Sequence, residues 1–225
     1  QARYLSGIAA GLNTKTNKIG YVAAMGLDNS EVTGGIDAFA LGIYSVNPDA
    51  KVYVKVTNSW YDPKGEEEAA KTLLNMNCDV IAQHCDTVYP QTLAQEKGVY
   101  SIGYNSDMSK EAPEACLCSV IWNWSAYYTS AVQSVIDGTW DGSNYYGGMN
   151  ENLVSITPVA DFAADTTQEK VNVAKQQILS GKNGVFDGVI ETNTGATVGT
   201  AGKTLEDSVI TGGINWYFKT VSVIE

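Results

Sequence analysis

The chain has 225 residues, of which 44% are hydrophobic and 10% aromatic, so it can bury a sizeable core and is not disordered. Its 25 acidic and 14 basic residues give a net charge of −11, and so acidic a surface repels nucleic acids and anionic membranes. No run of about 18 apolar residues occurs, which excludes a membrane-spanning helix. The N-terminus shows no leader pattern, so we expect any export signal to lie outside this chain.

The first segment, Gln1–Leu12, carries one apolar stripe at helical spacing. We expect it to be the last helix of a preceding lobe, and we expect further sequence before it in the full protein. Five short runs, nearly continuous in apolar residues, then read as strands covered on both faces. These are Lys18–Met25, Val52–Asn58, Cys78–Cys85, Val99–Asn105 and Cys116–Trp122.

Segments with helical periodicity separate these strands. They are Glu31–Val46, Asp62–Asn77 with Asp62 as N-cap and Pro63 at its first position, Val88–Lys97 and Ser125–Asp137. The last two stop at Gly98 and Gly138, which suit a helix C-terminus. Because strand and helix alternate, the sequence predicts an α/β fold with a doubly wound, parallel sheet.

After Gly138 the character of the sequence changes. Trp140–Asn150 reads as a long loop, Leu153–Thr157 as a short strand and Thr166–Ser180 as a helix. The glycine-rich stretch Gly184–Gly202 fits neither a dinucleotide fingerprint nor a P-loop and is interpreted as turns and a hairpin.

Aromatic and polar side chains follow all five predicted strands. Since the carboxyl ends of parallel strands meet at one edge of a sheet, where open α/β sheets bind ligands, we expect these side chains to line one pocket. Flat aromatic rings with amide, carboxylate and imidazole groups suit a small, flat, polar ligand. The candidate ligand-binding residues are Met25, Asn58, Trp60, His84, Asn105, Asp107, Trp122, Asn123 and Trp124.

Each main candidate has a purely structural alternative. Trp60 could act as a hydrophobic staple for the helix after it, and His84 could be a satisfied structural histidine. Asp107 could cap the turn that follows it. Trp122 and Trp124, two residues apart, could cover a domain interface.

Catalytic and metal sites have weak support. His84 is the only histidine, which excludes a paired-imidazole zinc site, and no Gly-x-Ser-x-Gly elbow occurs. Cys85 adjoins His84 on a strand, so the two side chains point to opposite faces. We predict no catalytic residues, no metal and no cofactor; a small-molecule enzyme using Asp107 and His84 is the weakest alternative.

The four cysteines contain no Cys-x-x-Cys pair. They are interpreted as buried free thiols, with a disulfide as the second interpretation and a metal or redox role as the third. They are Cys78, Cys85, Cys116 and Cys118.

A series of motifs carries a family resemblance. Taken in order, these motifs resemble the BMP (basic membrane protein) family of solute-binding lipoproteins of bacterial ABC importers. They are Lys18–Val22, Val46–Asp49, Asn58–Pro63, Cys78–His84 and Gly103–Met108, followed by Asp137–Trp140, Phe186–Gly188 and Ile214–Tyr217. The resemblance implies a type I periplasmic-binding-protein fold, in which two α/β lobes joined by a hinge hold a ligand between them. On that basis residues 1–17 would belong to a mostly missing N-terminal lobe, 18–150 to the C-terminal lobe, and 151–225 to a hinge crossing and a returning segment.

The resemblance also implies a function. Such a protein captures a purine outside the cytoplasm, either a nucleobase such as adenine or a nucleoside, and delivers it to an ABC permease without chemistry. A lipid anchor outside this chain would tether it to the membrane. A ligand-sensing regulatory module of the same fold is the main alternative.

Individual residues take their roles from the same resemblance. Trp60 would stack on the purine, and Asp107 would accept a hydrogen bond from it. His84 would fill the space of the sugar, which favours a free base. Trp124 matches a tryptophan of the adenine-type subgroup, while Trp122 and Asn123 stand near the position where nucleoside binders carry a lysine.

Overall fold

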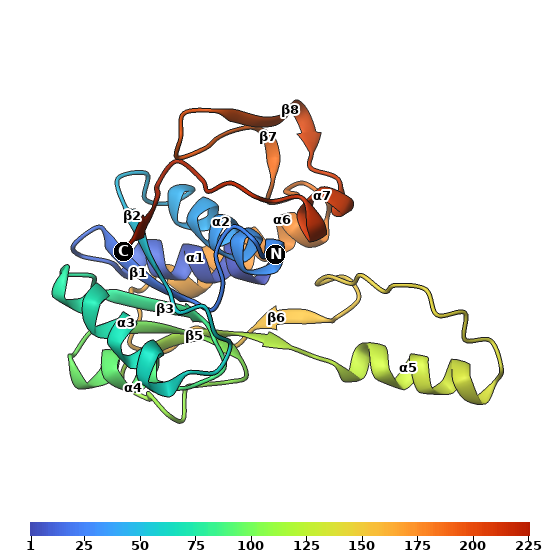
Figure 1. Ribbon diagram of the computed structural model, residues 1–225, viewed down its shortest axis with the longest axis horizontal. Coiled ribbons are helices and arrows are strands. Elements are labelled where there is room, and N and C mark those ends of the chain that lie inside the picture. Colours follow the sequence, from blue (N-terminus) through green and yellow to red (C-terminus); the bar gives the residue numbers. More distant parts are fainter.

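A seven-stranded sheet runs through the centre of the molecule in the computed structural model, which describes residues 1–225 (Figure 1). The strand order is β6-β5-β4-β3-β1-β2-β9, and all neighbours are parallel except β5 and β6. This confirms the predicted α/β class with a mostly parallel sheet. The strands are β1 (Lys18–Ala23), β2 (Lys51–Val56), β3 (Val80–His84), β4 (Tyr100–Asn105), β5 (Cys116–Trp122), β6 (Val154–Ile156) and β9 (Val221–Ile224).

Helices cover both faces of the sheet, as a doubly wound fold requires. On one face α1 packs against α2, α6 and β5, while α3 and α4 pack together on the other (Figure 1). Strands β1 and β3 are buried almost throughout, which explains their continuous apolar character. The helices are α1 (Ala2–Asn13), α2 (Ser30–Tyr44), α3 (Pro63–Asn75), α4 (Tyr89–Glu96), α5 (Ser125–Ile136), α6 (Thr167–Leu179) and α7 (Asp207–Gly212).

The predicted start of α3 is confirmed in detail. The Asp62 carboxylate accepts the backbone N–H of Gly65 at 3.0 Å, and Pro63 occupies the first helical position. Proline has no N–H to leave unpaired at that point, so both residues favour a helix beginning there. The same N-terminal turn brings the buried Glu66 within 2.5 Å of the Thr87 hydroxyl, which ties α3 to the end of β3.

Helix α1 packs closely on α2 through glycines. A Cβ atom at Gly42 would lie 2.0 Å from the carbonyl oxygen of Tyr4, and one at Gly7 would lie 2.1 Å from that of Phe39. The two backbones therefore touch where side chains normally separate helices. The partners of α1 within this chain are α2, α6 and strands β4 to β6; the assignment of residues 1–17 to another lobe stays a prediction.

The segment 123–148, called the arm below, projects from the body (Figure 1). It continues directly from β5, contains α5 and returns to β6. Helix α5 has no buried residue, and Val132, Val135 and Ile136 are largely exposed. In this chain the arm thus presents apolar side chains that no other element covers.

The C-terminal part contains the predicted hairpin and two elements that the sequence did not reveal, α7 and β9. Strands β7 (Asp187–Glu191) and β8 (Thr197–Thr204) pair antiparallel within Gly184–Gly202, which confirms the hairpin. The chain then passes through α7 and adds β9 as a parallel edge strand beside β2, with Val52 opposite Val221. The short β9 was not predicted.

Two further expectations can be compared with the structure. All four cysteines are buried and free, as the preferred interpretation of the sequence stated. None of the helices combines the length and the apolar character needed to cross a bilayer.

Candidate functional site

The carboxyl-end edge of the sheet gathers five aromatic rings, here called the aromatic cluster: Trp60, His84, Tyr104, Trp122 and Trp124. The His84 ring centroid lies 4.4 Å from that of Tyr104 and 5.8 Å from that of Trp60, both edge to face. The Trp122 indole N–H donates to the Tyr104 hydroxyl at 3.4 Å, and the Trp122 ring stacks on that of Trp124 with their centroids 5.0 Å apart. Residues that follow strands β2, β3, β4 and β5 thus meet at one place, as the strand-end rule predicts.

His84 occupies the buried centre of this cluster, with 3% of its surface exposed. Its Nδ1 lies 3.3 Å from the Tyr21 hydroxyl, and its Nε2 lies 3.7 Å from the Glu31 carboxylate. Burial, reinforced by the positive charge of Arg3, lowers the pKa of His84 to about 3. The imidazole is therefore uncharged at neutral pH.

Arg3 of α1 is a buried cation beneath the cluster, and sequence reasoning missed it. Its guanidinium donates to the carbonyl oxygen of Gln83 at 2.7 Å and lies 4.4 Å from the centre of the Tyr104 ring. No carboxylate lies within ion-pairing distance of it. The available signal was a single charged residue in the apolar segment Gln1–Leu12.

Glu31 is the second missed residue. It stands in the first turn of α2, which Asn29 caps by accepting the Val32 N–H at 3.1 Å. Its side chain is 53% exposed, and its Oε1 accepts a 3.4 Å hydrogen bond from Tyr104. The interaction with His84 is the main cause that lowers the pKa of Glu31, so its carboxylate is ionised.

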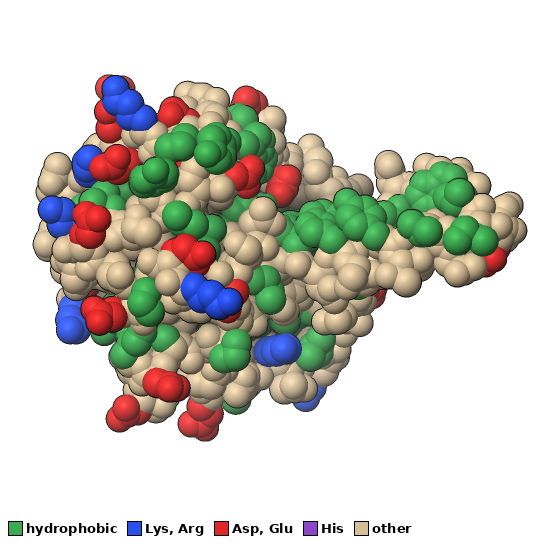
Figure 2. Space-filling model, turned by 90° about the horizontal axis from the view of Figure 1, so that it is seen from below, with side chains coloured by type: hydrophobic (Ala, Val, Ile, Leu, Met, Phe, Trp, Pro, Cys, Tyr) green, Lys and Arg blue, Asp and Glu red, His purple; other side chains and the backbone are tan.

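The two residues at the end of β5 also shape the arm. Trp124 is 45% exposed and stacks on Tyr128 at 5.8 Å, so the aromatic surface continues onto α5. Figure 2 shows apolar side chains extending from the body along the arm. Asn123 donates to the Asn152 carbonyl at 3.1 Å and accepts from the Ser125 hydroxyl, which fixes where the arm leaves the body.

The remaining predicted residues do not join the aromatic cluster through direct contacts. Asp107 is exposed, and its carboxylate accepts the Ser109 backbone N–H at 3.0 Å, the turn cap described by the structural alternative. This hydrogen bond lowers the pKa of Asp107. Asn58 and Asn105 are exposed in left-handed turns with φ of 57° and 68°, and Met25 packs half-buried against the core.

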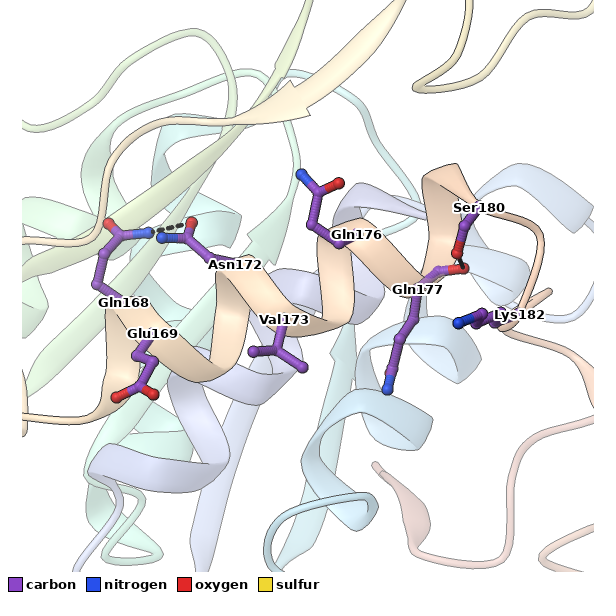
Figure 3. A pocket seen from close by; sticks show the side chains of 8 residues that line it. All are labelled: Gln168, Glu169, Asn172, Val173, Gln176, Gln177, Ser180 and Lys182. Atoms are coloured by element: carbon purple, nitrogen blue, oxygen red, sulfur yellow. Dashed lines mark hydrogen bonds between the residues drawn. The ribbon is translucent and has the colours of Figure 1, made fainter.

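Two concave regions lie elsewhere on the molecule, and no predicted site residue lines either. One, of about 620 Å³, follows the polar face of α6 past Gln168, Asn172 and Gln176 (Figure 3). The other, of about 460 Å³, lies between α2 and β7, with Tyr44 and Lys219 among its residues. The candidate site is instead a half-buried aromatic edge.

This edge can bind but has no arrangement for covalent catalysis. Asp107 and His84 contact different partners and do not form the acid–base pair that the enzyme alternative requires. The aromatic rings offer faces and edges for stacking, and Glu31 and His84 offer polar atoms beside them.

Comparison with known proteins agrees with a binding role. Residues 1–185 match the family described as Bmp, ABC transporter substrate-binding protein PnrA-like. The chain is 35% identical over 217 residues to a purine-binding protein of Brucella abortus (strain 2308), covering 96% of this chain and 61% of that protein. It is 36% identical over 188 residues to TsgA13 of Haloferax volcanii, a candidate glucose-binding ABC transporter protein, covering 84% of this chain and 48% of that protein.

A solved ABC solute-binding protein from Aeropyrum pernix K1 has the same fold. It superposes with a TM-score of 0.69 at 17% identity, covering 80% of this chain and 62% of that one. The matched region thus spans between 48% and 62% of the length of these proteins. Because the family model matches residues 1–185, the chain belongs to the PnrA-like Bmp family of ABC transporter substrate-binding proteins, a family of binding proteins rather than enzymes.

Proposed function

We propose that this protein captures a purine nucleobase, with adenine as the first candidate, and passes it unchanged to an ABC permease. The observation that carries the proposal is the aromatic cluster at the carboxyl-end edge of the sheet. Trp60 and Tyr104 contact an uncharged, buried His84 there, and Trp122 contacts Tyr104. Aromatic faces are worth about 1–3 kcal/mol per stacked base.

A free base is favoured over a nucleoside because of His84. The imidazole fills the centre of the cluster and leaves 3% of its surface exposed, which leaves little room for a ribose beside it. The proposed site also lacks a lysine for ribose hydroxyls: Trp122 and Asn123 stand at the end of β5. The 35% identical Brucella protein, which is named as purine-binding, supports the same ligand class.

The proposed transport role is supported by the family match and includes a two-lobed arrangement, with a second lobe outside this chain, as part of the proposal. As proposed, residues 18–150 and the returning segment 151–225 form one lobe and its hinge, and the ligand is enclosed against a second lobe. The permease would recognise the closed form, in which the two lobes meet around the ligand. An extracytoplasmic location, with a lipid anchor outside this chain, completes the proposal.

A ligand titration followed by tryptophan fluorescence and by protein NMR shifts tests this function. The ligands are adenine, guanine, hypoxanthine, adenosine and glucose. Both methods detect dissociation constants up to the millimolar range. We expect adenine to bind and Trp60→Ala to weaken it about tenfold or more. Trp140→Ala is the matched control, since Trp140 is 47% exposed on the arm. Binding of glucose with no response to any purine would replace the purine proposal with a sugar one.

A further inference from the structure

Two buried polar atoms at the candidate site have no hydrogen-bond partner: Nε2 of His84 and one terminal nitrogen of Arg3. Both side chains are more than nine-tenths buried. Buried polar groups in folded proteins are nearly always paired, so an unpaired one at a binding site points to a partner supplied by the ligand. His84 says more about the ligand, because its other ring nitrogen, Nδ1, already has the Tyr21 hydroxyl as a hydrogen-bond partner.

The neighbours of His84 define which nitrogen carries the proton. The Glu31 carboxylate, 3.7 Å from Nε2, favours a proton on that nitrogen. The Tyr21 hydroxyl, 3.3 Å from Nδ1, can then donate to the deprotonated Nδ1. Burial raises the pKa of Tyr21, so its hydroxyl remains a donor. Nε2 is thus an N–H donor beside a carboxylate acceptor.

The charged and titratable groups around His84 come from four elements. Arg3 approaches from α1, Tyr21 from β1, Glu31 from α2 and Tyr104 from β4. The last neighbours, Cys85 and Asp86, follow His84 in the chain. Of these, only Arg3 is a cation, and it lies against both tyrosine rings that contact the imidazole, at 5.6 Å and 4.4 Å from their centres. Its charge opposes a second positive charge on His84.

We propose that the Nε2–H of His84 and the carboxylate of Glu31 form a donor–acceptor pair that recognises one edge of the ligand, and that Arg3 is a positioning residue whose charge adds to burial in keeping His84 uncharged. The proposal rests on the proposed function and specifies its ligand chemistry: a flat ring with an acceptor next to an N–H donor. Adenine presents N7 beside its N6 amino group, whereas guanine presents two acceptors, N7 and O6, at the same edge.

NMR of the imidazole tests the positioning role without any ligand. His84 is the only histidine, so the ¹⁵N and ¹H signals of the ring need no further assignment. We expect the wild-type ring to stay neutral, with its proton on Nε2, from pH 5 to pH 8. Arg3→Met should raise the pH at which the ring titrates, and Arg3→Lys, which keeps the charge, should not. A wild-type ring that titrates near its ordinary value, or an Arg3→Met ring that behaves as in the wild type, overturns this role.

Ligand titrations test the donor–acceptor pair. Glu31→Gln, at an exposed position that tolerates substitution, should weaken adenine binding about tenfold while His84 stays neutral. In Arg3→Met, adenine affinity should begin to fall at a higher pH than in the wild type. If Arg3→Met fails to fold by circular dichroism, Arg3→Gln, which also removes the charge, replaces it in both measurements, and Glu31→Gln still tests the donor–acceptor pair.

The two proposals fail in different ways. If the imidazole is neutral and no purine binds, the proposed function is overturned together with the ligand half of this inference, while the role of Arg3 stands. If adenine binds equally well to Glu31→Gln and the wild type, the purine function stands and the donor–acceptor pair is overturned.

Discussion

Gly35 of α2 lies directly against the imidazole of His84. A Cβ atom at this position would be 2.9 Å from Cε1 of the ring and 3.0 Å from Nδ1. The helix therefore approaches the end of β3 closely enough to hold the ring between its backbone and the side chains of Tyr104 and Trp60. The position of the central residue of the candidate site depends on the absence of a side chain on a neighbouring helix.

Gly35→Ala should displace His84 and weaken ligand binding. The added methyl group forces the ring or the helix to move, which costs about 1–3 kcal/mol of stability. We expect adenine affinity to fall about tenfold and the His84 NMR signals to shift. Gly34→Ala is the control, because the nearest atom to its Cβ would be 3.3 Å away, on the flexible Ile214 side chain. Equal effects from the two variants would show that Gly35 does not position the ring.

Gly42→Ala should destabilise the whole domain. Alanine normally favours a helix over glycine by about 1 kcal/mol, but here its Cβ would lie 2.0 Å from the Tyr4 carbonyl oxygen. Helix α1 must move away from α2, so we expect a net loss of about 2 kcal/mol or more in urea unfolding. Gly26→Ala, whose Cβ would meet nothing closer than 3.8 Å, should change the midpoint little. A stabilised Gly42→Ala variant would contradict the observed helix contact.

The architecture could be predicted because parallel strands leave a clear signature. A strand covered on both faces is a short apolar run, and the run Cys78–Cys85 contains β3, Val80–His84, with two residues to spare at its start. The C-terminal strand β9 has no such signature. Val221–Ile224 is four residues long and lies at the edge of the sheet, so only its pairing with β2 identifies it.

The candidate site was predictable only in part. Trp60, His84 and Trp122 stand at or just after the ends of strands, and the strand-end rule brings them together. Tyr104, a further ring of the aromatic cluster, was not among the predicted site residues. Arg3 and Glu31 lie on helices and reach the site through packing, which no local pattern in the sequence reveals. The role of Asp107 as a ligand contact stays a prediction, since its carboxylate in this chain caps its own turn.

Asp37→Asn should stabilise the protein at neutral and alkaline pH. The Asp37 side chain is fully buried; one oxygen accepts the Phe218 N–H at 2.7 Å and the other has no partner. Burial raises the pKa of Asp37 well above its usual value. As the pH rises above about 4, the unfolded chain releases this proton first, so the wild type loses stability with rising pH.

The asparagine variant keeps the acceptor for Phe218 and cannot ionise. We expect it to be more stable than the wild type by about 1–3 kcal/mol at pH 8, and we expect this difference to shrink toward pH 4.5. Urea unfolding at both values measures it. Asp161→Asn, at an exposed position, is the control. A variant that is less stable than the wild type at pH 8 would mean that the ionised carboxylate is compensated in the fold.

The exposed arm yields the last prediction, through a matched pair of isoleucines. Ile136 on α5 is 72% exposed, and Ile36 on α2 is fully buried. Ile36→Ala should cost about 2–5 kcal/mol because it leaves a cavity in the core. Ile136→Ala should change the free energy of unfolding by less than about 0.5 kcal/mol, since the Ile136 side chain is exposed and α5 has no buried residue.

The same substitution should change how copies of the chain associate. Val132, Val135 and Ile136 place exposed apolar side chains on one short helix, and such a patch promotes contacts between molecules. We expect sedimentation velocity at high protein concentration to show less self-association for Ile136→Ala than for the wild type. A loss of stability as large as that of Ile36→Ala would instead show that α5 folds back onto the body in solution, and the projecting arm of Figure 1 would then be wrong.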